Sequence, residues 1–243
     1  MTAGIVLAGG RSSRMGAPKA WLEWHGTTLL RRTCAIVARG AGGPVVVVKA
    51  PGQELPELPD GVRVVEDARE GRGPLQGVLA GLEAVDGEVA FVASTDMPFL
   101  HPRFVAAVCA AVGDADAAVP RVGGFLQPLA AAYRTTLAPL VGRLLADDVL
   151  KVSLLPERCD ARVLDDLPHP ESVRNVNDRA GYEAALVEPL PLVRVRGLGA
   201  GVRAATLGAA AAAAGVALDT ATLNGVPDKD PLEPLVAGDE LAF

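Results

Sequence analysis

Short apolar runs alternate with longer segments of helical periodicity over the first half of the chain. In the longer segments, apolar residues recur three or four positions apart, which is typical of amphipathic helices. The expected strands cover residues 3–8, 44–49, 62–67 and 88–95, and the expected helices cover residues 27–40 and 75–85. This alternation predicts an α/β, doubly wound fold with a mostly parallel sheet, and the Val-rich strands 44–49 and 62–67 fit its buried interior.

The pattern changes after about Glu188. A proline-rich stretch, EPLPLV, looks like a linker. It precedes a strand-like LVRVRG, an Ala-rich helix, a strand-like TATLNG and a closing VAGDELAF. We therefore expect two domains, residues 1–188 and residues 189–243, of which the second is near the lower size limit for independent folding.

The chain has 243 residues, half of them hydrophobic, and a formal net charge of −6. This acidic balance argues against a nucleic-acid partner, because such proteins normally present a basic face. Cys34, Cys109 and Cys159 are widely spaced and form no CxxC pair, so we expect free thiols in a cytoplasmic protein. We expect no membrane segment, because no stretch is long and apolar enough.

The stretch IVLAGGRSSRMGAPKAWL leaves a predicted strand through two glycines and then carries three cationic residues. Ligands of open α/β sheets bind beyond the carboxyl ends of strands. Gly9 and Gly10 would let backbone amides approach phosphate oxygens, and Arg14 and Lys19 would neutralise the charge of a polyphosphate. The stretch matches neither a Walker A loop nor the dinucleotide fingerprint. An ordinary glycine turn with solvated cations is the alternative.

Two aspartates also follow predicted strands. Asp96, in VASTDMPFL, could hold Mg²⁺ against phosphate oxygens, since this cation prefers oxygen ligands. It could instead cap a turn before Pro98. Asp67 precedes a glycine-rich segment that leads to Pro74, and it could help to shape a pocket for a nucleotide base; a simple helix-entry turn is the alternative.

Two asparagines, Asn175 and Asn177, stand in RNVNDRAGYEAA just before a predicted helix. This position favours a structural role as much as a functional one, because Asn177 or Asp178 would serve as the N-cap of the helix.

Taken in order, LAGGRSSRMGAPK, GPLQGVLAGL, STDMPFL, QPLAAAYR and NVND resemble the motifs of the molybdenum cofactor guanylyltransferases, the MobA family. The resemblance covers roughly residues 1–188, about three-quarters of the chain. The first and third motifs are shared by the wider nucleotidyltransferase superfamily, which has a Rossmann-like fold. GPLQGVLAGL together with the later NVN points to this family in particular.

The resemblance implies transfer of GMP from Mg-GTP to the terminal phosphate of molybdopterin, or of its molybdenum-loaded form, with release of pyrophosphate. It implies catalytic roles for Arg14, Lys19 and Asp96, with Asp96 also holding Mg²⁺. Asn175 and Asn177 would lie near the acceptor. The implied nucleotide-binding residues are Leu7, Ala8, Gly9, Gly10, Lys19, Asp67, Pro74, Leu75 and Asp96.

Three positions depart from the family pattern and bear on the choice of base. Ala50 or Pro51 stands where an asparagine often follows the second strand, Gln76 replaces a small residue after GPL, and Pro18 replaces an acidic residue before the lysine. A cytidylyltransferase acting on molybdopterin therefore stays open. So do a nucleotidyltransferase for another phosphorylated acceptor and a non-catalytic nucleotide-binding regulator.

The stretch TATLNGVPDKDPLEPLVAGDELAF resembles the second half of the β-grasp sulfur carriers of molybdopterin synthesis. Those carriers end in Gly-Gly, the site of thiocarboxylation, whereas this sequence stops at Phe243, so we do not expect sulfur loading. The resemblance implies a β-grasp-like appendage. It would dock a cofactor-handling partner, such as molybdopterin synthase or the molybdenum insertase, or it would be a stabilising cap.

Overall fold

The computed structural model describes residues 1–9, 18–67, 71–197 and 201–243. These residues pack into two compact units, one of residues 1–22 and 29–177 and one of residues 23–28 and 178–243. The second unit therefore includes six residues from near the start of the chain. The predicted domain boundary between residues 188 and 189 stays a prediction, because compact packing does not show which segment folds independently.

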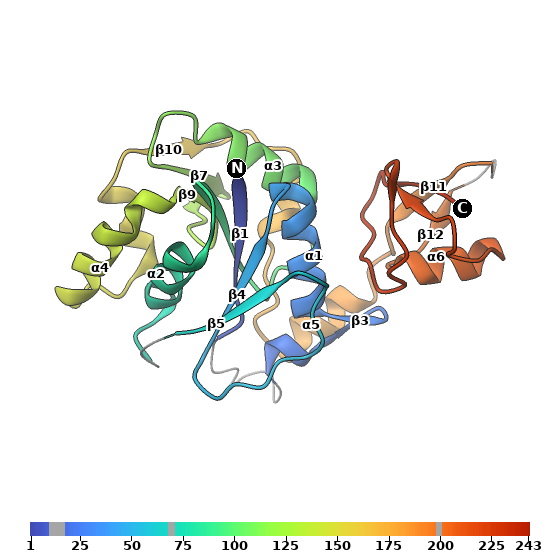
Figure 1. The fold of residues 1–243 in the computed structure, drawn as a ribbon, viewed down its shortest axis with the longest axis horizontal. Coiled ribbons are helices and arrows are strands. Elements are labelled where there is room, and N and C mark those ends of the chain that lie inside the picture. Colours follow the sequence, from blue (N-terminus) through green and yellow to red (C-terminus); the bar gives the residue numbers. More distant parts are fainter. Residues whose placement is uncertain (10–17, 68–70, 198–200) are drawn as a thin grey trace. The chain divides into compact units, whose positions relative to one another are not determined.

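The larger unit is built on an eight-stranded sheet (Figure 1). Its strands are β1 (Thr2–Leu7), β4 (Val45–Lys49), β5 (Arg63–Glu66), β6 (Val89–Ser94), β7 (Ala117–Val122), β8 (Phe125–Leu126), β9 (Ala130–Arg134) and β10 (Ala161–Leu164). The spatial order is β10-β7-β9-β6-β1-β4-β5, and β8 pairs with β7. Strand β9 runs antiparallel to β6 and β7, whereas β1 is parallel to both β4 and β6. The predicted α/β fold with a mostly parallel sheet is confirmed.

Helices cover both faces of this sheet. They are α1 (Leu29–Ala41), α2 (Pro74–Ala84), α3 (Pro102–Ala111) and α4 (Ala138–Ala146), with short 3₁₀ turns η1 (Lys19–Trp21), η2 (Thr135–Leu137), η3 (Val152–Glu157) and η4 (Pro170–Val173). Helices α1 and α3 pack together on one side, and α2 and α4 on the other (Figure 1). Helix α2 approaches β1 closely at Gly81, where a Cβ atom would lie 2.4 Å from Cγ2 of Ile5.

The two Val-rich strands differ in burial. Strand β4 is buried along its four valines, as its uninterrupted apolar run predicts. The prediction of a buried interior strand is wrong for β5, where Arg63, Val64 and Glu66 are exposed. Among the described strands, β5 pairs with β4 alone and lies at the edge of the sheet, so it has a neighbouring strand on one side only.

The smaller unit has a separate five-stranded sheet. Its strands are β11 (Leu192–Val195), β12 (Val202–Arg203), β13 (Thr222–Leu223), β14 (Val226–Pro227) and β15 (Glu240–Ala242), in the order β12-β11-β15-β13-β14. Strands β11 and β15 are parallel neighbours, and helix α6 (Leu207–Ala214) packs on the buried face of the sheet. This strand order supports a β-grasp-like appendage, which stays a prediction.

The smaller unit also contains helix α5 (Arg179–Leu186) and the hairpin of β2 (Glu23–Trp24) and β3 (Thr27–Thr28). The hydroxyl of Tyr182 in α5 donates a hydrogen bond to the carbonyl of Glu23. The ring of Tyr182 also lies 6.5 Å from that of Trp24, so the hairpin and the helix pack as one piece.

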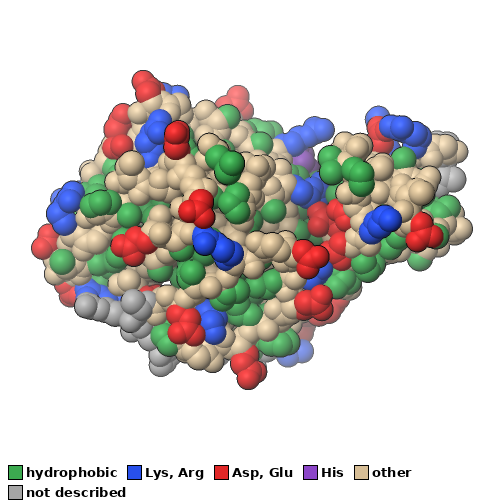
Figure 2. Space-filling view, in the orientation of Figure 1, with side chains coloured by type: hydrophobic (Ala, Val, Ile, Leu, Met, Phe, Trp, Pro, Cys, Tyr) green, Lys and Arg blue, Asp and Glu red, His purple; other side chains and the backbone are tan. Residues whose placement is uncertain are grey.

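Among the described residues, no helix has the length and apolar character needed to cross a membrane. On the face of the larger unit shown in Figure 2, acidic and basic side chains are interspersed among hydrophobic ones. The charge on this face therefore does not locate the site, and the cationic residues of the site are identified from their contacts in the structure.

Candidate active site

A pocket of about 360 Å³ opens at the carboxyl ends of β1 and β6. Three segments, residues 7–9, 94–97 and 127–130, form most of its wall, and Lys19, Val152 and Asn175 complete it. The third segment reaches this edge because β9 is antiparallel, so that Ala130 at its start pairs with Ala93 near the end of β6. The volume suits a small-molecule ligand.

The floor of the pocket is fixed by the register of β1 and β6. Leu7 and Ser94 are partners in the parallel ladder, and the hydroxyl of Thr95 donates to the carbonyl of Leu7 at 2.9 Å. The backbone N–H of Ala8 donates to Val48 at 2.9 Å. The two loops that follow these strands therefore leave the sheet side by side.

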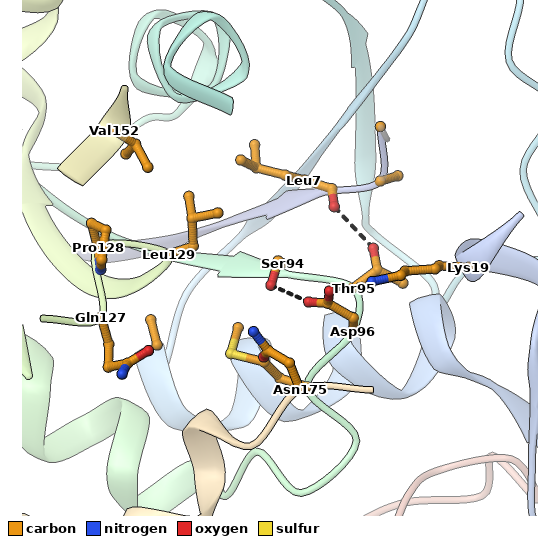
Figure 3. Close-up of a pocket in the computed structure, with 14 residues that line it drawn as sticks. Leu7, Lys19, Ser94, Thr95, Asp96, Gln127, Pro128, Leu129, Val152 and Asn175 are labelled. Atoms are coloured by element: carbon orange, nitrogen blue, oxygen red, sulfur yellow. Dashed lines mark hydrogen bonds and ion pairs between the residues drawn. The ribbon is translucent and has the colours of Figure 1, made fainter. Parts of the chain in front are cut away.

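Lys19 and Asp96 form an ion pair at this edge, with Nζ of Lys19 2.6 Å from Oδ2 of Asp96 (Figure 3). Nζ also donates to Oδ1 of Asn177 at 3.3 Å. The side chains of Lys19 and Asp96 are 23% and 15% exposed, so the pair is half-buried but reachable from the pocket. Three residues predicted for the site, from distant parts of the sequence, are thus brought together.

Asp96 has further partners on both its side chain and its backbone. The hydroxyl of Ser94 donates to Oδ1 at 2.5 Å (Figure 3), and the backbone carbonyl of Asp96 accepts from Val176 at 2.9 Å. Val176 stands between Asn175 and Asn177, so this backbone bond holds both asparagines beside the aspartate. Asn175 itself lines the pocket.

The donor atoms suit a metal ion that arrives with a substrate. No group of three or more His, Cys, Asp or Glu side chains that could hold a metal occurs in the described ranges. Mg²⁺ is usually bound by one or two carboxylates plus substrate phosphates, and it keeps several waters. The Asp96 carboxylate therefore fits a role as the protein ligand of a Mg²⁺ bound to a nucleotide.

Of the two residues considered as the N-cap of α5, Asp178 is confirmed and Asn177 is wrong. The side chain of Asp178 accepts a hydrogen bond from the backbone of Gly181 at 2.8 Å. The side chain of Asn177 instead contacts Lys19. Three of the predicted nucleotide-binding residues that the structure describes, Asp67, Pro74 and Leu75, do not line the pocket.

Of these three, Asp67 follows β5 and is held by its backbone N–H, which donates to Lys49 at 2.8 Å. Pro74 is the exposed first residue of α2, and Leu75 is completely buried in the core. A contact between Leu75 and a nucleotide would require this segment to move. Gly10 and Arg14 lie outside the described residues, and the roles of all five stay predictions.

The structure also places in the site residues to which the sequence analysis gave no role. One is Gln53, whose carboxamide donates to the carbonyl of Ala8 at 3.0 Å and accepts from the backbone of Ala50 at 3.0 Å. A carboxamide thus does lie beside the first loop, two or three residues after the position where the family pattern has its asparagine. Gln127 and Pro128 are a second case: QPL was noted as a motif, but only the sheet order shows that it forms a pocket wall.

Residues 4–161 match the family model described as the MobA-like NTP transferase domain. The chain belongs to the MobA-like NTP transferase family. The resemblance inferred from the motifs is confirmed, and the protein is an enzyme of the nucleotidyltransferase class. Lys19 and Asp96 fall inside the matched residues of this MobA-like transferase, and Asn175 and Asn177 follow them.

Comparisons with individual proteins agree over about three-quarters of the chain. A protein from Mycobacterium tuberculosis named "Probable molybdenum cofactor guanylyltransferase" is 38% identical over 192 residues, which cover 76% of the MobA-like transferase and 92% of that protein. A protein of the same name from Bacillus cereus is 31% identical over 193 residues, which cover 75% of the MobA-like transferase and 94% of that protein. The crystal structure of molybdopterin-guanine dinucleotide biosynthesis protein A from Archaeoglobus fulgidus has the same fold, with a TM-score of 0.61 and 21% sequence identity. The match covers 76% of the MobA-like transferase and 96% of that protein.

Proposed function

We propose that this transferase moves GMP from Mg-GTP to the terminal phosphate of molybdopterin and releases pyrophosphate, forming a guanine dinucleotide cofactor. The observation that carries the proposal is the Lys19–Asp96 pair with Asn177 on the same lysine, set at the edge of the sheet where α/β proteins bind ligands. The names of the relatives support guanine as the base and molybdopterin as the acceptor.

In this reaction an oxygen of the acceptor phosphate attacks the α-phosphorus of GTP. A new P–O bond forms there, the bond from the α-phosphorus to the oxygen that bridges to the β-phosphorus breaks, and pyrophosphate leaves with that electron pair. The attacking phosphate is already anionic, so no strong general base is required. Catalysis then consists of alignment and neutralisation of charge.

Lys19 supplies the mobile positive charge. Its ammonium has three donors on a flexible stem, and it would leave Asp96 for the phosphate oxygens when a nucleotide binds. When bound, Mg²⁺ would supply Lewis-acid stabilisation of the phosphates, with Asp96 as its protein ligand. Asn177 would hold Lys19 on the acceptor side, and Asn175 would contact the acceptor.

The remaining contacts of the proposal come from three places. Gly10 and Arg14 would contact the phosphates. Asp67 and the segment that begins at Pro74 would contact the nucleotide on the base side. Gln53 supports the geometry of the first loop, because its side chain fixes the carbonyl of Ala8.

The test is pyrophosphate release by the purified protein with molybdopterin and Mg²⁺, with GTP, CTP, ATP and UTP compared. We expect release with GTP, and a loss of at least about a hundredfold in Asp96→Ala with cooperative unfolding retained. Asp219→Ala, which changes an exposed aspartate of the smaller unit, serves as the matched control. Preference for CTP would keep the mechanism and overturn the base. Silence with all four nucleotides, from folded protein and competent acceptor, would overturn the proposed function.

A further inference from the structure

Ser94 is the last residue of β6 and lines the pocket beside Asp96. Its hydroxyl lies 2.5 Å from Oδ1 of Asp96, and Nζ of Lys19 lies 2.6 Å from Oδ2. Both groups are therefore within hydrogen-bonding distance of the carboxylate. The two oxygens of one carboxylate thus have different partners, a neutral donor on one side and a cation on the other (Figure 3).

The two partners differ in how firmly they are held. Ser94 pairs with Leu7 in the parallel ladder, and the neighbouring Thr95 side chain is bonded to the same Leu7, so the serine hydroxyl projects from a fixed strand end. Lys19 reaches Asp96 through a long, flexible side chain of four methylene groups. Lys19 can therefore exchange Asp96 for another partner, while Ser94 stays on Oδ1.

We infer that Ser94 is a positioning residue that orients the Asp96 carboxylate, so that Oδ2 faces the cation bound in the pocket. The inference rests on the proposed function, in which Asp96 holds Mg²⁺. The terminal torsion of an aspartate is broad, so the side chain alone does not fix which oxygen faces the site. Mg²⁺ requires near-ideal octahedral geometry at about 2.0–2.1 Å, so an unoriented carboxylate would bind it poorly.

The position of Lys19 supports this assignment. In the structure Oδ2 already faces a cation, the Lys19 ammonium, and Lys19 and Asp96 both line the pocket. When Lys19 moves to the phosphates, the serine keeps Oδ2 on the side that the ammonium occupied. Groups that orient a metal ligand typically change metal affinity or activity by about 10–100-fold.

The first test is the Mg²⁺ concentration that gives half-maximal pyrophosphate release. In Ser94→Ala we expect it to rise about tenfold or more, with much of the rate recovered at saturating Mg²⁺. Ser94→Thr keeps the hydroxyl and suits a strand, so it should stay within about twofold of the wild type. Ser153→Ala removes an exposed serine hydroxyl elsewhere and should leave the value unchanged. An unchanged Mg²⁺ requirement in Ser94→Ala, or an equal loss in Ser94→Thr, would overturn the inference.

The second test needs no turnover. The affinity for an α,β-methylene analogue of GTP is measured by calorimetry with and without Mg²⁺. In Ser94→Ala the gain in affinity from Mg²⁺ should shrink about tenfold, with the metal-free affinity unchanged. An equal loss in both conditions would assign Ser94 to packing and overturn the inference.

The wild-type results separate the two proposals. A wild type that binds the analogue in a Mg²⁺-dependent way but releases no pyrophosphate would reject the proposed function, and the binding comparison would still decide the role of Ser94. A wild type that gains no affinity from Mg²⁺ would overturn the role of Ser94.

Discussion

Lys19→Ala separates the two contributions of the lysine, one to stability and one to rate. The ion pair with Asp96 is half-buried, so its loss should cost more than that of an exposed pair and less than that of a buried one, about 1–2 kcal/mol of the free energy of unfolding. Asp96 would keep the Ser94 hydroxyl on Oδ1, and water would take the place of Lys19 at Oδ2. The melting temperature should fall by about 3–6 °C.

The expected effect on rate is larger. Removal of one donor that stabilises charge in a transition state typically costs about 10²–10³-fold, or about 3–4 kcal/mol. A domain with about 5–15 kcal/mol of stability stays folded after a loss of about 1–2 kcal/mol. Unfolding therefore cannot account for such a loss of rate.

The assay combines initial rates of pyrophosphate release, taken well below the melting temperature, with urea unfolding of the same samples. Lys229→Ala, at an exposed lysine of the smaller unit, controls for the loss of one surface charge. A rate for Lys19→Ala within about threefold of the wild type would refute the reasoning, because Lys19 would then make no contact with the reacting phosphates.

Two further predictions test packing and ionisation. Gly81→Ala should lower the free energy of unfolding by about 1–3 kcal/mol, because the new Cβ would lie 2.4 Å from Ile5. Gly142→Ala, at a position in α4 with open space around it, should raise the free energy of unfolding by up to about 1 kcal/mol. Urea midpoints that shift equally in the two variants would contradict this prediction. Burial raises the pKa of Cys109 to about 12, and burial together with the charges of two nearby aspartates raises the pKa of Cys159 to about 11. At about pH 8 the thiolate fraction of Cys159 should therefore be about a hundredfold lower than that of an ordinary thiol with a pKa of 9.0, and that of Cys109 lower still. Ellman's reagent should therefore react with these two thiols far more slowly in native than in urea-unfolded protein, and equal rates would contradict the burial argument.

The parallel core of the fold could be predicted from the sequence because its signals are local. Each expected strand of the first half became a strand of the sheet, and Pro74 stands at the first position of α2, as a helix entry predicts. The exposure of β5 could not be predicted, because edge and interior positions depend on strand order, which the valines of 62–67 do not encode.

The site was predictable where a motif carried its own chemistry. Lys19 and Asp96 were found from residue type and position after predicted strands, Asn177 was found from the family motif, and the structure joins the three. Ser94 and Gln53 were not found, because their roles depend on which side-chain atoms meet across neighbouring strands and loops. The sequence alone does not indicate that Ser94, two positions before Asp96, ends a strand and donates to that carboxylate.

The direction of β9 has a consequence for how this site can change. The ends of β1 and β6 form the pocket floor and carry Asp96, the ion-pair partner of Lys19. The opposite wall comes from the beginning of β9, which follows the β7–β8 hairpin and its exposed Phe125 in the chain. Insertions or exchanges in that hairpin would reshape the far wall without shifting the register of β1 and β6. Under the proposed function, one half of the pocket would bind phosphates and the other half could diverge independently, so that one chemistry could be retained while the acceptor is exchanged.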